Sequence, residues 1–289
     1  PYAAPLPSGP RRAPDGEPVV ALVGRLAPWK GQHLFLDALE RLSADGVRLR
    51  GRLLGAALFG EDDHAAEVAA RLDRPPLAGR VTLGSFTGDA ASALADAPDC
   101  VVAVEVNLSC PNTEAARDLF AHSPSSTHDA IAATAGCGRP RWAKLSPNVT
   151  DLVPIAEAAR AGGAEAVTLV NTVLGMAIDP ETGTYRLGSG PRGGGLSGPA
   201  IHPVAVRAVH DVHAALPDLP IVGVGGVVHG ADAAELVLAG ASAVQVGTAT
   251  FADPRAPARV LRELTGWAER TGRRRLADQV GAAHQKEPT

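Results

Sequence analysis

A short segment of the sequence carries a thiol between two side-chain amides. Asn107, Cys110 and Asn112 lie within six residues, at the end of an apolar run that we predict to be a strand. In barrels of alternating strands and helices, the active site lies at the carboxyl ends of the strands. A lone cysteine is more often a small buried hydrophobic residue, but the loop position and the flanking amides favour a functional role for Cys110.

Four polar side chains at predicted strand ends could together bind a planar ring. Each of them alone could simply cap a loop. As a set, they offer amide and hydroxyl groups to a ring that carries carbonyl, N–H and carboxylate groups. The set is Asn107, Asn112, Asn171 and Thr172.

Lys144 is one of only three lysines in the chain, and it lies in an apolar strand pattern between Ala143 and Leu145. Burying an ammonium group is costly unless an anion or a polar ring meets the charge. Two interpretations remain open: Lys144 forms a buried ion pair, or it faces a polar ligand.

Two turns that contain glycine follow the seventh and eighth predicted strands: Gly225 with Gly226, and Gly247 with Thr248. Barrels commonly bind phosphate through backbone N–H groups at these two strand ends, and glycine permits the close approach. A glycine pair can also be a plain turn, but two pairs at these positions favour a phosphate site. A literal G-x-G-x-x-G at Gly193–Gly198 lies in a long loop instead of directly after a strand, so we reject a Rossmann site there.

The remaining candidates for chemistry are weak. His210 and His213 have the i, i+3 spacing of metal ligands on a helix, but no third ligand is evident, so we expect no metal and a solvated helix face. Cys100 and Cys137 have no comparable context and are expected to be inert packing residues. No zinc, P-loop or Ser/His/Asp motif stands out.

Eight short apolar runs alternate with segments of helical period from residue 19 onward. This alternation is typical of repeated βα units with a parallel sheet. Eight units would complete a (β/α)8 barrel, although doubly wound open sheets show the same alternation. The predicted strands are Val19–Val23, Leu49–Leu54, Arg80–Gly84, Val101–Leu108, Arg141–Leu145, Ala166–Val170, Ile221–Val224 and Ala243–Val246.

Three further segments can be interpreted from their composition. Six prolines in the first 18 residues predict a flexible leader over residues 1–17. The glycine-rich stretch of residues 172–199 is longer than an ordinary βα loop, which predicts a lid. Helical period predicts that the first helix buries a face formed by Leu34, Phe35, Ala38, Leu39 and Leu42.

The overall composition excludes several classes of protein. With 289 residues, 45% of them apolar and 20% charged, the chain can bury a sizeable core. A net charge of −4 and few aromatic residues give no footprint for nucleic acid. The longest uncharged apolar stretch, Leu236–Ala252, is shorter than the roughly 20 residues of a membrane span. Three cysteines and the lack of a signal-like start predict a reduced, cytoplasmic protein.

Six motifs occur in order between residues 102 and 266. They are Val-Glu-Val-Asn-Leu-Ser-Cys-Pro-Asn (104–112), Ala-Lys-Leu-Ser-Pro-Asn-Val-Thr-Asp (143–151), Leu-Val-Asn-Thr (169–172), Gly-Gly-Leu-Ser-Gly-Pro-Ala-Ile (194–201), Val-Gly-Gly-Val (224–227) and Val-Gly-Thr-Ala-Thr-Phe-Ala-Asp-Pro (246–254). This ordered set resembles the last five βα units of class 1 dihydroorotate dehydrogenases, and the 1B subtype most of all.

The resemblance implies a barrel that binds FMN and oxidises dihydroorotate to orotate. It makes Cys110 the base that removes the C5 proton while C6 passes a hydride to flavin N5, and it places the four polar side chains around the substrate. A thiol has an ordinary pKa of about 8.5, so this base needs help from its surroundings or a rising pH. The implied cofactor-binding residues are Lys144, beside flavin N1 and the C2 carbonyl, and Gly198, Gly225, Gly226, Gly247 and Thr248.

The 1B subtype also implies an electron-transfer partner, an iron–sulfur flavoprotein subunit that works with NAD. We further expect a homo-oligomer.

The first hundred residues do not carry that family's early motifs. Residues 1–106 contain no Asn and only one Lys, whereas the family has an Ala-Ser-Gly turn, a flavin-contacting Lys and an Asn-rich substrate loop there. The run Val23–Gln32 resembles instead the nucleotide-binding domain of retaining GT-B glycosyltransferases, where the residues that match Arg25 and Lys30 hold the donor diphosphate.

We therefore predict a chimera with a leader (1–17), a glycosyltransferase-like segment of Rossmann-like origin that supplies three βα units (18–99) and a dehydrogenase-like barrel segment (100–289). Two alternatives to the dehydrogenase remain open: a remnant nucleotide-sugar transferase, and a non-catalytic protein that binds flavin or phosphate.

Overall fold

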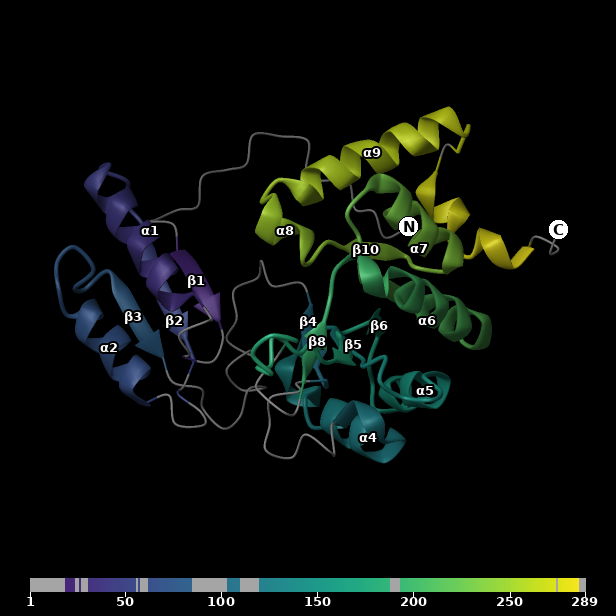
Figure 1. The fold of residues 1–289 in the computed structure, drawn as a ribbon, viewed down its shortest axis with the longest axis horizontal. Helices are drawn as coiled ribbons and strands as arrows, with labels where there is room; N and C mark the ends of the chain where they lie inside the picture. Colours follow the sequence, from purple (N-terminus) through teal and green to yellow (C-terminus); the bar gives the residue numbers. More distant parts are fainter. Residues whose placement is uncertain are drawn as a thin grey trace. The chain divides into compact units, whose positions relative to one another are not determined.

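The computed structural model describes residues 19–23, 26, 31–55, 57, 62–84, 103–109, 120–187, 193–273 and 275–285. The chain divides into two compact units, residues 1–93 and residues 94–289, which are drawn in Figure 1. The predicted leader, Arg25, Lys30, Cys110 and Asn112 lie outside the described residues.

The first unit contains a three-stranded parallel sheet in the order β1-β2-β3, with one helix after each of the first two strands. This is the βαβαβ alternation expected from the sequence. Its elements are β1 (Val19–Val23), α1 (Gln32–Ala44), β2 (Arg50–Leu54), α2 (Asp62–Leu72) and β3 (Val81–Gly84).

Helix α1 buries a different face from the one predicted. Leu36 and Leu39 are buried in a cluster with Leu53 on β2, whereas Leu34 is 63% exposed and Leu42 is 37% exposed. A helix buries one stripe along its length, and Leu34 lies two residues, or more than half a turn, away from Leu36. The predicted face was therefore wrong at both of its ends.

The second unit contains a five-stranded parallel sheet in the order β10-β9-β6-β5-β4. Figure 1 shows its long helices in an arc along one side of the sheet. The elements are β4 (Val104–Asn107), α4 (Pro124–Ala132), β5 (Arg141–Lys144), α5 (Val153–Ala161), β6 (Ala166–Leu169), α6 (His202–Ala215), β9 (Ile221–Val224), α7 (Gly230–Ala239), β10 (Ala243–Gln245), α8 (Ala249–Ala252) and α9 (Ala256–Arg270). Within the described ranges, none of the helices is sufficiently long and apolar to cross a membrane.

All eight predicted strands are confirmed, with ends shifted by up to three residues. They form parallel sheets of three and five strands flanked by helices, so the α/β prediction is confirmed. The closure of one barrel from all eight strands, and the Rossmann-like origin of the first three, stay predictions.

The five-stranded sheet is strongly curled, as shown by a contact between side chains of its two edge strands. Glu105 on β4 accepts a hydrogen bond from Gln245 on β10 over 3.0 Å, and another from Thr168 on the central strand β6 over 2.6 Å. Neighbouring strands lie about 4.8 Å apart, so the edges of a flat five-stranded sheet would be about 19 Å apart. In a barrel, each interior layer is formed by side chains from every second strand. Glu105, Thr168 and Gln245 come from every second strand of this sheet.

The core of this unit lies between the sheet and its helices. Leu145, Leu169, Ile221 and Leu236 are fully buried there, in one continuous apolar cluster. All four strand positions of β6 are buried as well. A continuous apolar run of this kind is typical of a parallel strand that is covered on both faces.

The long segment predicted as a lid contains regular structure. Val173–Gly175 (β7) pairs antiparallel with Gly194–Leu196 (β8), and Ile178 bridges to Tyr185 further out. Short 3₁₀ turns complete the second unit: η2 (Phe120–His122), η3 (Ala135–Cys137), η5 (Pro199–Ile201), η6 (Leu276–Gln279) and η7 (Ala282–Gln285). The role of a lid stays a prediction.

The helix face predicted to be solvated at the two histidines of α6 is only partly exposed, with 46% of the His210 side chain accessible. The ring of His284, in η7, stacks on His210 with centroids 4.0 Å apart and lies 5.1 Å from His213. The Nε2 atom of His284 is 3.0 Å from the carbonyl oxygen of Ala239, at the end of α7. These contacts join the C-terminal turn to α6 and α7. Among the described residues, no group of histidine, cysteine or acidic side chains is arranged to hold a metal ion.

This histidine cluster predicts a loss of stability in mild acid. Burial, followed by the nearby His284 and His210, lowers the pKa of His213 below its ordinary value of 6.5. The unfolded chain therefore takes up a proton that the folded chain resists, so stability falls as the pH drops through about 6.5. We expect the melting temperature to fall between pH 7.5 and 5.5, and to fall less for His213→Gln. An equal fall in both proteins would contradict this prediction.

Candidate functional site

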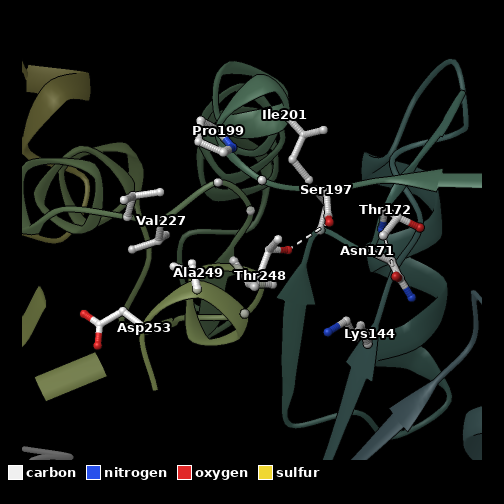
Figure 2. Close-up of a pocket in the computed structure, with 18 of the residues that line it drawn as sticks. Lys144, Asn171, Thr172, Ser197, Pro199, Ile201, Val227, Thr248, Ala249 and Asp253 are labelled. Atoms are coloured by element: carbon white, nitrogen blue, oxygen red, sulfur yellow. Dashed lines mark hydrogen bonds between the residues drawn. The ribbon is translucent and has the colours of Figure 1, made fainter. Parts of the chain in front are cut away.

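A cavity of about 390 Å³ lies at the carboxyl ends of β5, β6, β9 and β10 (Figure 2). The loops after these strands and the segment after β8 form its wall, so it occupies the end of the sheet where barrels place active sites. It is lined by Lys144, Val170, Asn171, Thr172, Ser197, Gly198, Pro199, Ile201, Val224, Gly225, Gly226, Val227, Val228, Gly247, Thr248, Ala249, Ala252, Asp253 and Arg259.

The structure brings most of the predicted site residues together in this one cavity. Asn107 lies beside it, because Asn171 Nδ2 donates to Asn107 Oδ1 over 3.0 Å. Cys110 and Asn112 follow Asn107 in the sequence but lie outside the described residues. The predicted residues in the wall are Lys144, Asn171, Thr172, Gly198, Gly225, Gly226, Gly247 and Thr248.

Lys144 contacts an acidic side chain and also borders the cavity, while its role toward a polar ligand stays a prediction. Its side chain lines the cavity, and its Nζ is 3.7 Å from Glu105 Oε1. The other carboxylate oxygen of Glu105 accepts the hydrogen bonds from Thr168 and Gln245, which fix its position. Glu105 was not predicted as a site residue, since its partners come from strands that are far apart in the chain.

Asn148 fixes the base of the β7–β8 hairpin at the rim of the cavity. Its Nδ2 donates to the carbonyl oxygen of Thr172 over 3.0 Å, and its Oδ1 accepts from the backbone N–H of Leu174 over 2.8 Å. The side chain of Asn171 is fixed in turn, since its Oδ1 accepts from the backbone N–H of Thr172 over 2.8 Å. Asn148 belongs to one of the six motifs, but no signal in the sequence linked it to Thr172.

The turn after β9 requires glycine at two successive positions. Gly225 has φ +140° and Gly226 has φ +67°, in the region that other residues rarely adopt. A Cβ at Gly226 would lie 2.7 Å from His202 Cβ and 2.9 Å from the carbonyl oxygen of Gly198. His202 also holds this turn, because its Nδ1 is 2.8 Å from the carbonyl oxygen of Gly225 and its Nε2 is 3.2 Å from Glu235 Oε2.

The turn after β10 contacts the segment after β8 across the cavity. Thr248 Oγ1 donates to Ser197 Oγ over 2.8 Å, which Figure 2 shows as a dashed line. A Cβ added at Gly247 would meet no atom within 4 Å, so this position faces open space. Ser197 was not predicted as a site residue, although it precedes the predicted Gly198 in the same motif.

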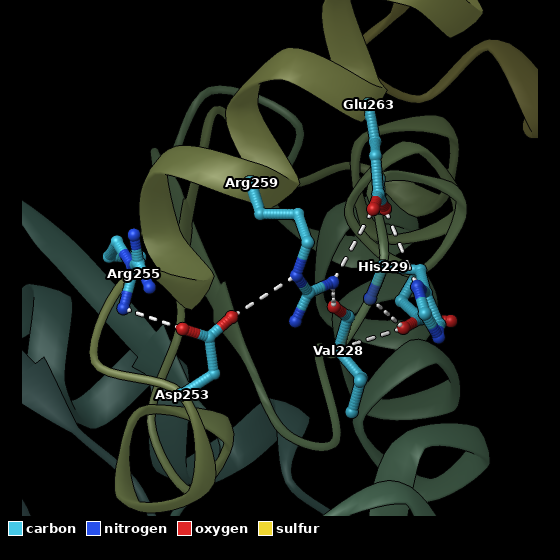
Figure 3. A network of polar contacts seen from close by, with 8 residues as sticks. Val228, His229, Asp253, Arg255, Arg259 and Glu263 are labelled. Carbon is cyan, nitrogen blue, oxygen red and sulfur yellow. Dashed lines mark hydrogen bonds and ion pairs between the residues drawn. The ribbon is translucent and has the colours of Figure 1, made fainter.

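A network of charged groups joins α9 to the turn after β9 and to Asp253 at the end of α8 (Figure 3). Arg259 Nη1 donates to the carbonyl oxygen of Val228 over 2.8 Å, and its Nε donates to Asp253 Oδ2 over 3.3 Å. Glu263 Oε2 accepts from the backbone N–H of Gly230 over 2.7 Å. This bond, together with Arg259, lowers the pKa of Glu263. A bond from the backbone N–H of Arg255, aided by Arg259, lowers the pKa of Asp253.

Comparisons with known proteins identify relatives of this chain. A putative dihydroorotate dehydrogenase A (fumarate) from Solibacter usitatus is 48% identical over 178 residues, which are 61% of this chain and 58% of that protein. The catalytic subunit of a dihydroorotate dehydrogenase B (NAD(+)) from Desulforudis audaxviator is 43% identical over 220 residues, 75% of this chain and 70% of that subunit. The chain thus spans little more than half of the length of the Solibacter relative.

A solved structure supports the same fold. The crystal structure of DHODH in complex with ferulenol from Eimeria tenella matches with a TM-score of 0.58 and 22% sequence identity, over 80% of this chain and 70% of that one. The family model described as dihydroorotate dehydrogenase matches residues 74–267. On this match the chain belongs to the dihydroorotate dehydrogenase family.

Proposed function

We propose that the chain binds FMN and oxidises dihydroorotate to orotate. The observation that carries the proposal is the convergence of predicted residues from four strand ends on one cavity, with a lysine at one side and glycine turns beside it. The chain spans only part of its relatives, so this activity is proposed for the present chain alone.

The residues of the cavity fit a flavin mononucleotide. The turn at Gly225 and Gly226 has no room for side chains and exposes backbone to the cavity, which suits a phosphate group. Lys144 offers a positive charge near the other side, where it would favour the reduced, anionic form of a flavin ring. When bound, FMN would supply the hydride acceptor that no amino-acid side chain provides.

In this proposal the remaining predicted residues act on the substrate. Asn107, Asn112, Asn171 and Thr172 hold the ring of dihydroorotate, and Cys110 removes the proton from C5. The bond between Asn171 and Asn107 supports a shared role, since it places two of these amides in contact. A thiol base is favoured by surroundings that stabilise the thiolate, or by a rising pH.

The electron acceptor follows from the partner. From the resemblance to the 1B subtype, we propose an iron–sulfur flavoprotein subunit that passes electrons to NAD. The B-type relatives are named as catalytic subunits and carry NAD(+) in their names. The A-type relatives carry fumarate in their names. The two electron acceptors are distinguished by assaying the reduced protein with fumarate, and with NAD in the presence of such a subunit. Reduction of fumarate by the chain alone would reject the proposed partner subunit.

A titration with FMN is the first test. Purified protein should quench the fluorescence of free FMN and become yellow, whereas a sugar nucleotide would leave it colourless. The remnant glycosyltransferase, which would use Arg25 and Lys30, predicts binding of a nucleotide sugar without flavin. The non-catalytic alternative predicts FMN binding without turnover of dihydroorotate. No quenching at high protein concentration would reject the flavin proposal.

Lys144→Ala should weaken FMN binding by about tenfold or more and lower the reduction potential of bound flavin. The melting temperature should fall as well, since the change leaves the half-buried Glu105 carboxylate without its cation. A drop in stability therefore does not separate a cofactor role from a structural one.

The double variant Lys144→Ala/Glu105→Gln separates these roles, because it removes the ion pair as a whole. We expect the melting temperature to recover in part while FMN binding stays weak. If the double variant bound FMN as tightly as the unchanged chain, Lys144 would be a structural residue.

A further inference from the structure

The cavity has a second cation at the side opposite Lys144. Among its described lining residues, Lys144 and Arg259 carry positive charge, and Asp253 carries the negative charge. Figure 2 shows Lys144 and Asp253 on opposite sides, with Thr248 and Ala249 between them. Arg259 lies on the side of Asp253, to which it is hydrogen-bonded. Positively charged side chains thus lie on two opposite sides of the cavity.

The guanidinium group of Arg259 is fixed by acceptors from three segments. Its Nη1 donates to the carbonyl oxygen of Val228 and to Glu263 Oε1, 3.4 Å away, and its Nε donates to Asp253. These contacts leave both N–H bonds of Nη2 without an acceptor among the described residues. The side chain is 28% exposed, and the two carboxylates raise its pKa. The Nη2 group of Arg259 is therefore a charged hydrogen-bond donor in a fixed position at the wall of the cavity.

We propose that Arg259 binds the phosphate group of a phosphomonoester ligand in this cavity. The identification of that ligand as FMN rests on the proposed function. A phosphomonoester carries about −1.5 to −2 charge at neutral pH, and the neutral N–H groups of the glycine turns do not balance it. Arginine supplies a positive charge and two donors in a plane, and Arg259 shares that charge with Asp253 and Glu263. Arg259 also neutralises Asp253, whose free carboxylate in the same wall would repel a phosphate.

The test compares FMN with riboflavin, which differs only by lacking the phosphate. In Arg259→Gln, the preference for FMN over riboflavin should fall about tenfold or more, with riboflavin affinity unchanged. Arg259→Lys, which keeps the charge, should lose less. Arg262→Gln is the matched control, because Arg262 is exposed on the same helix and does not line the cavity; it should bind both flavins as the unchanged chain does.

Two outcomes would overturn the role of Arg259. One is an unchanged preference for FMN in Arg259→Gln, and the other is an equal loss of both flavins. If Arg259→Gln fails to fold, the same ratio is measured in Arg259→Met, which removes the charge but keeps a long side chain; no change there would overturn the proposal.

Inorganic phosphate separates this proposal from the flavin proposal. Phosphate should raise the melting temperature of the unchanged chain and of Arg262→Gln, but not that of Arg259→Gln. If this holds while neither flavin binds, the arginine site stands and the flavin assignment fails. If phosphate has no effect on the unchanged chain and neither flavin binds, both proposals are rejected.

Discussion

Cys110→Ser should lower the rate of dihydroorotate oxidation by about 10² to 10⁴ at pH 7, since a positioned base typically contributes that much. FMN binding should be retained, because the proposed cofactor contacts are made by Lys144, Arg259 and the two glycine turns. A hydroxyl group is a far weaker acid than a thiol, so the variant should recover some activity as the pH rises. The measurements are the pH profile of the rate and the FMN affinity of the same protein.

Cys137→Ser is the control for this experiment. Cys137 is buried in η3, with its Sγ 3.4 Å from the carbonyl oxygen of Arg139, and does not line the cavity. Its substitution should leave the rate unchanged below the melting temperature. Equal rates for Cys110→Ser and the unchanged chain at pH 7 would reject the base. A chain that binds FMN but does not oxidise dihydroorotate would favour the non-catalytic alternative.

The strands and the site residues at their ends were predictable because both depend on local sequence. A parallel strand covered on both faces is a short, continuous apolar run, as at Ile221–Val224. The carboxyl ends of parallel strands meet at one edge, so polar residues and glycines just after such runs are expected to converge. The cavity contains Thr172, Gly226 and Thr248 for this reason.

The contacts that the sequence did not predict join residues with no local relation. Glu105 and Gln245 are 140 residues apart and meet only because the sheet curls. His284 lies more than seventy residues beyond His210, yet their rings stack. Arg259 belongs to an amphipathic helix, where an arginine is ordinarily a surface residue. Its role becomes visible only when the turns at Val228 and Asp253 are placed beside it.

The origin of residues 18–99 has to be judged from matches to known proteins instead of from local sequence patterns. The family model begins at residue 74. A relative from Trichlorobacter lovleyi matches 253 of the 289 residues at 41% identity, so its match includes part of this segment. The derivation of residues 18–99 from a glycosyltransferase stays a prediction. Binding of a nucleotide sugar to the purified chain would support it.

Gly226→Ala should abolish measurable FMN binding, with a loss of about 100-fold or more. At φ +67° an alanine costs about 1 to 2 kcal/mol in backbone strain. Its Cβ would also overlap His202 Cβ and the carbonyl oxygen of Gly198, so the turn must move. A displaced turn would lose the hydrogen bonds that we propose it makes to the phosphate, each worth about 1.5 to 3 kcal/mol because the acceptor is charged. The loss of two such hydrogen bonds accounts for the expected 100-fold decrease in FMN affinity.

Gly183→Ala isolates the contribution of backbone strain to this result. Gly183 has nearly the same φ, +68°, but lies in the hairpin segment with nothing within 4 Å of an added Cβ, and it does not line the cavity. Both alanine variants should lower the melting temperature, yet only Gly226→Ala should lose FMN. If both bound FMN as the unchanged chain does, the turn after β9 would not bind phosphate. If both lost it equally, the effect of Gly226→Ala would reflect reduced stability, since Gly183 has no contact with the site.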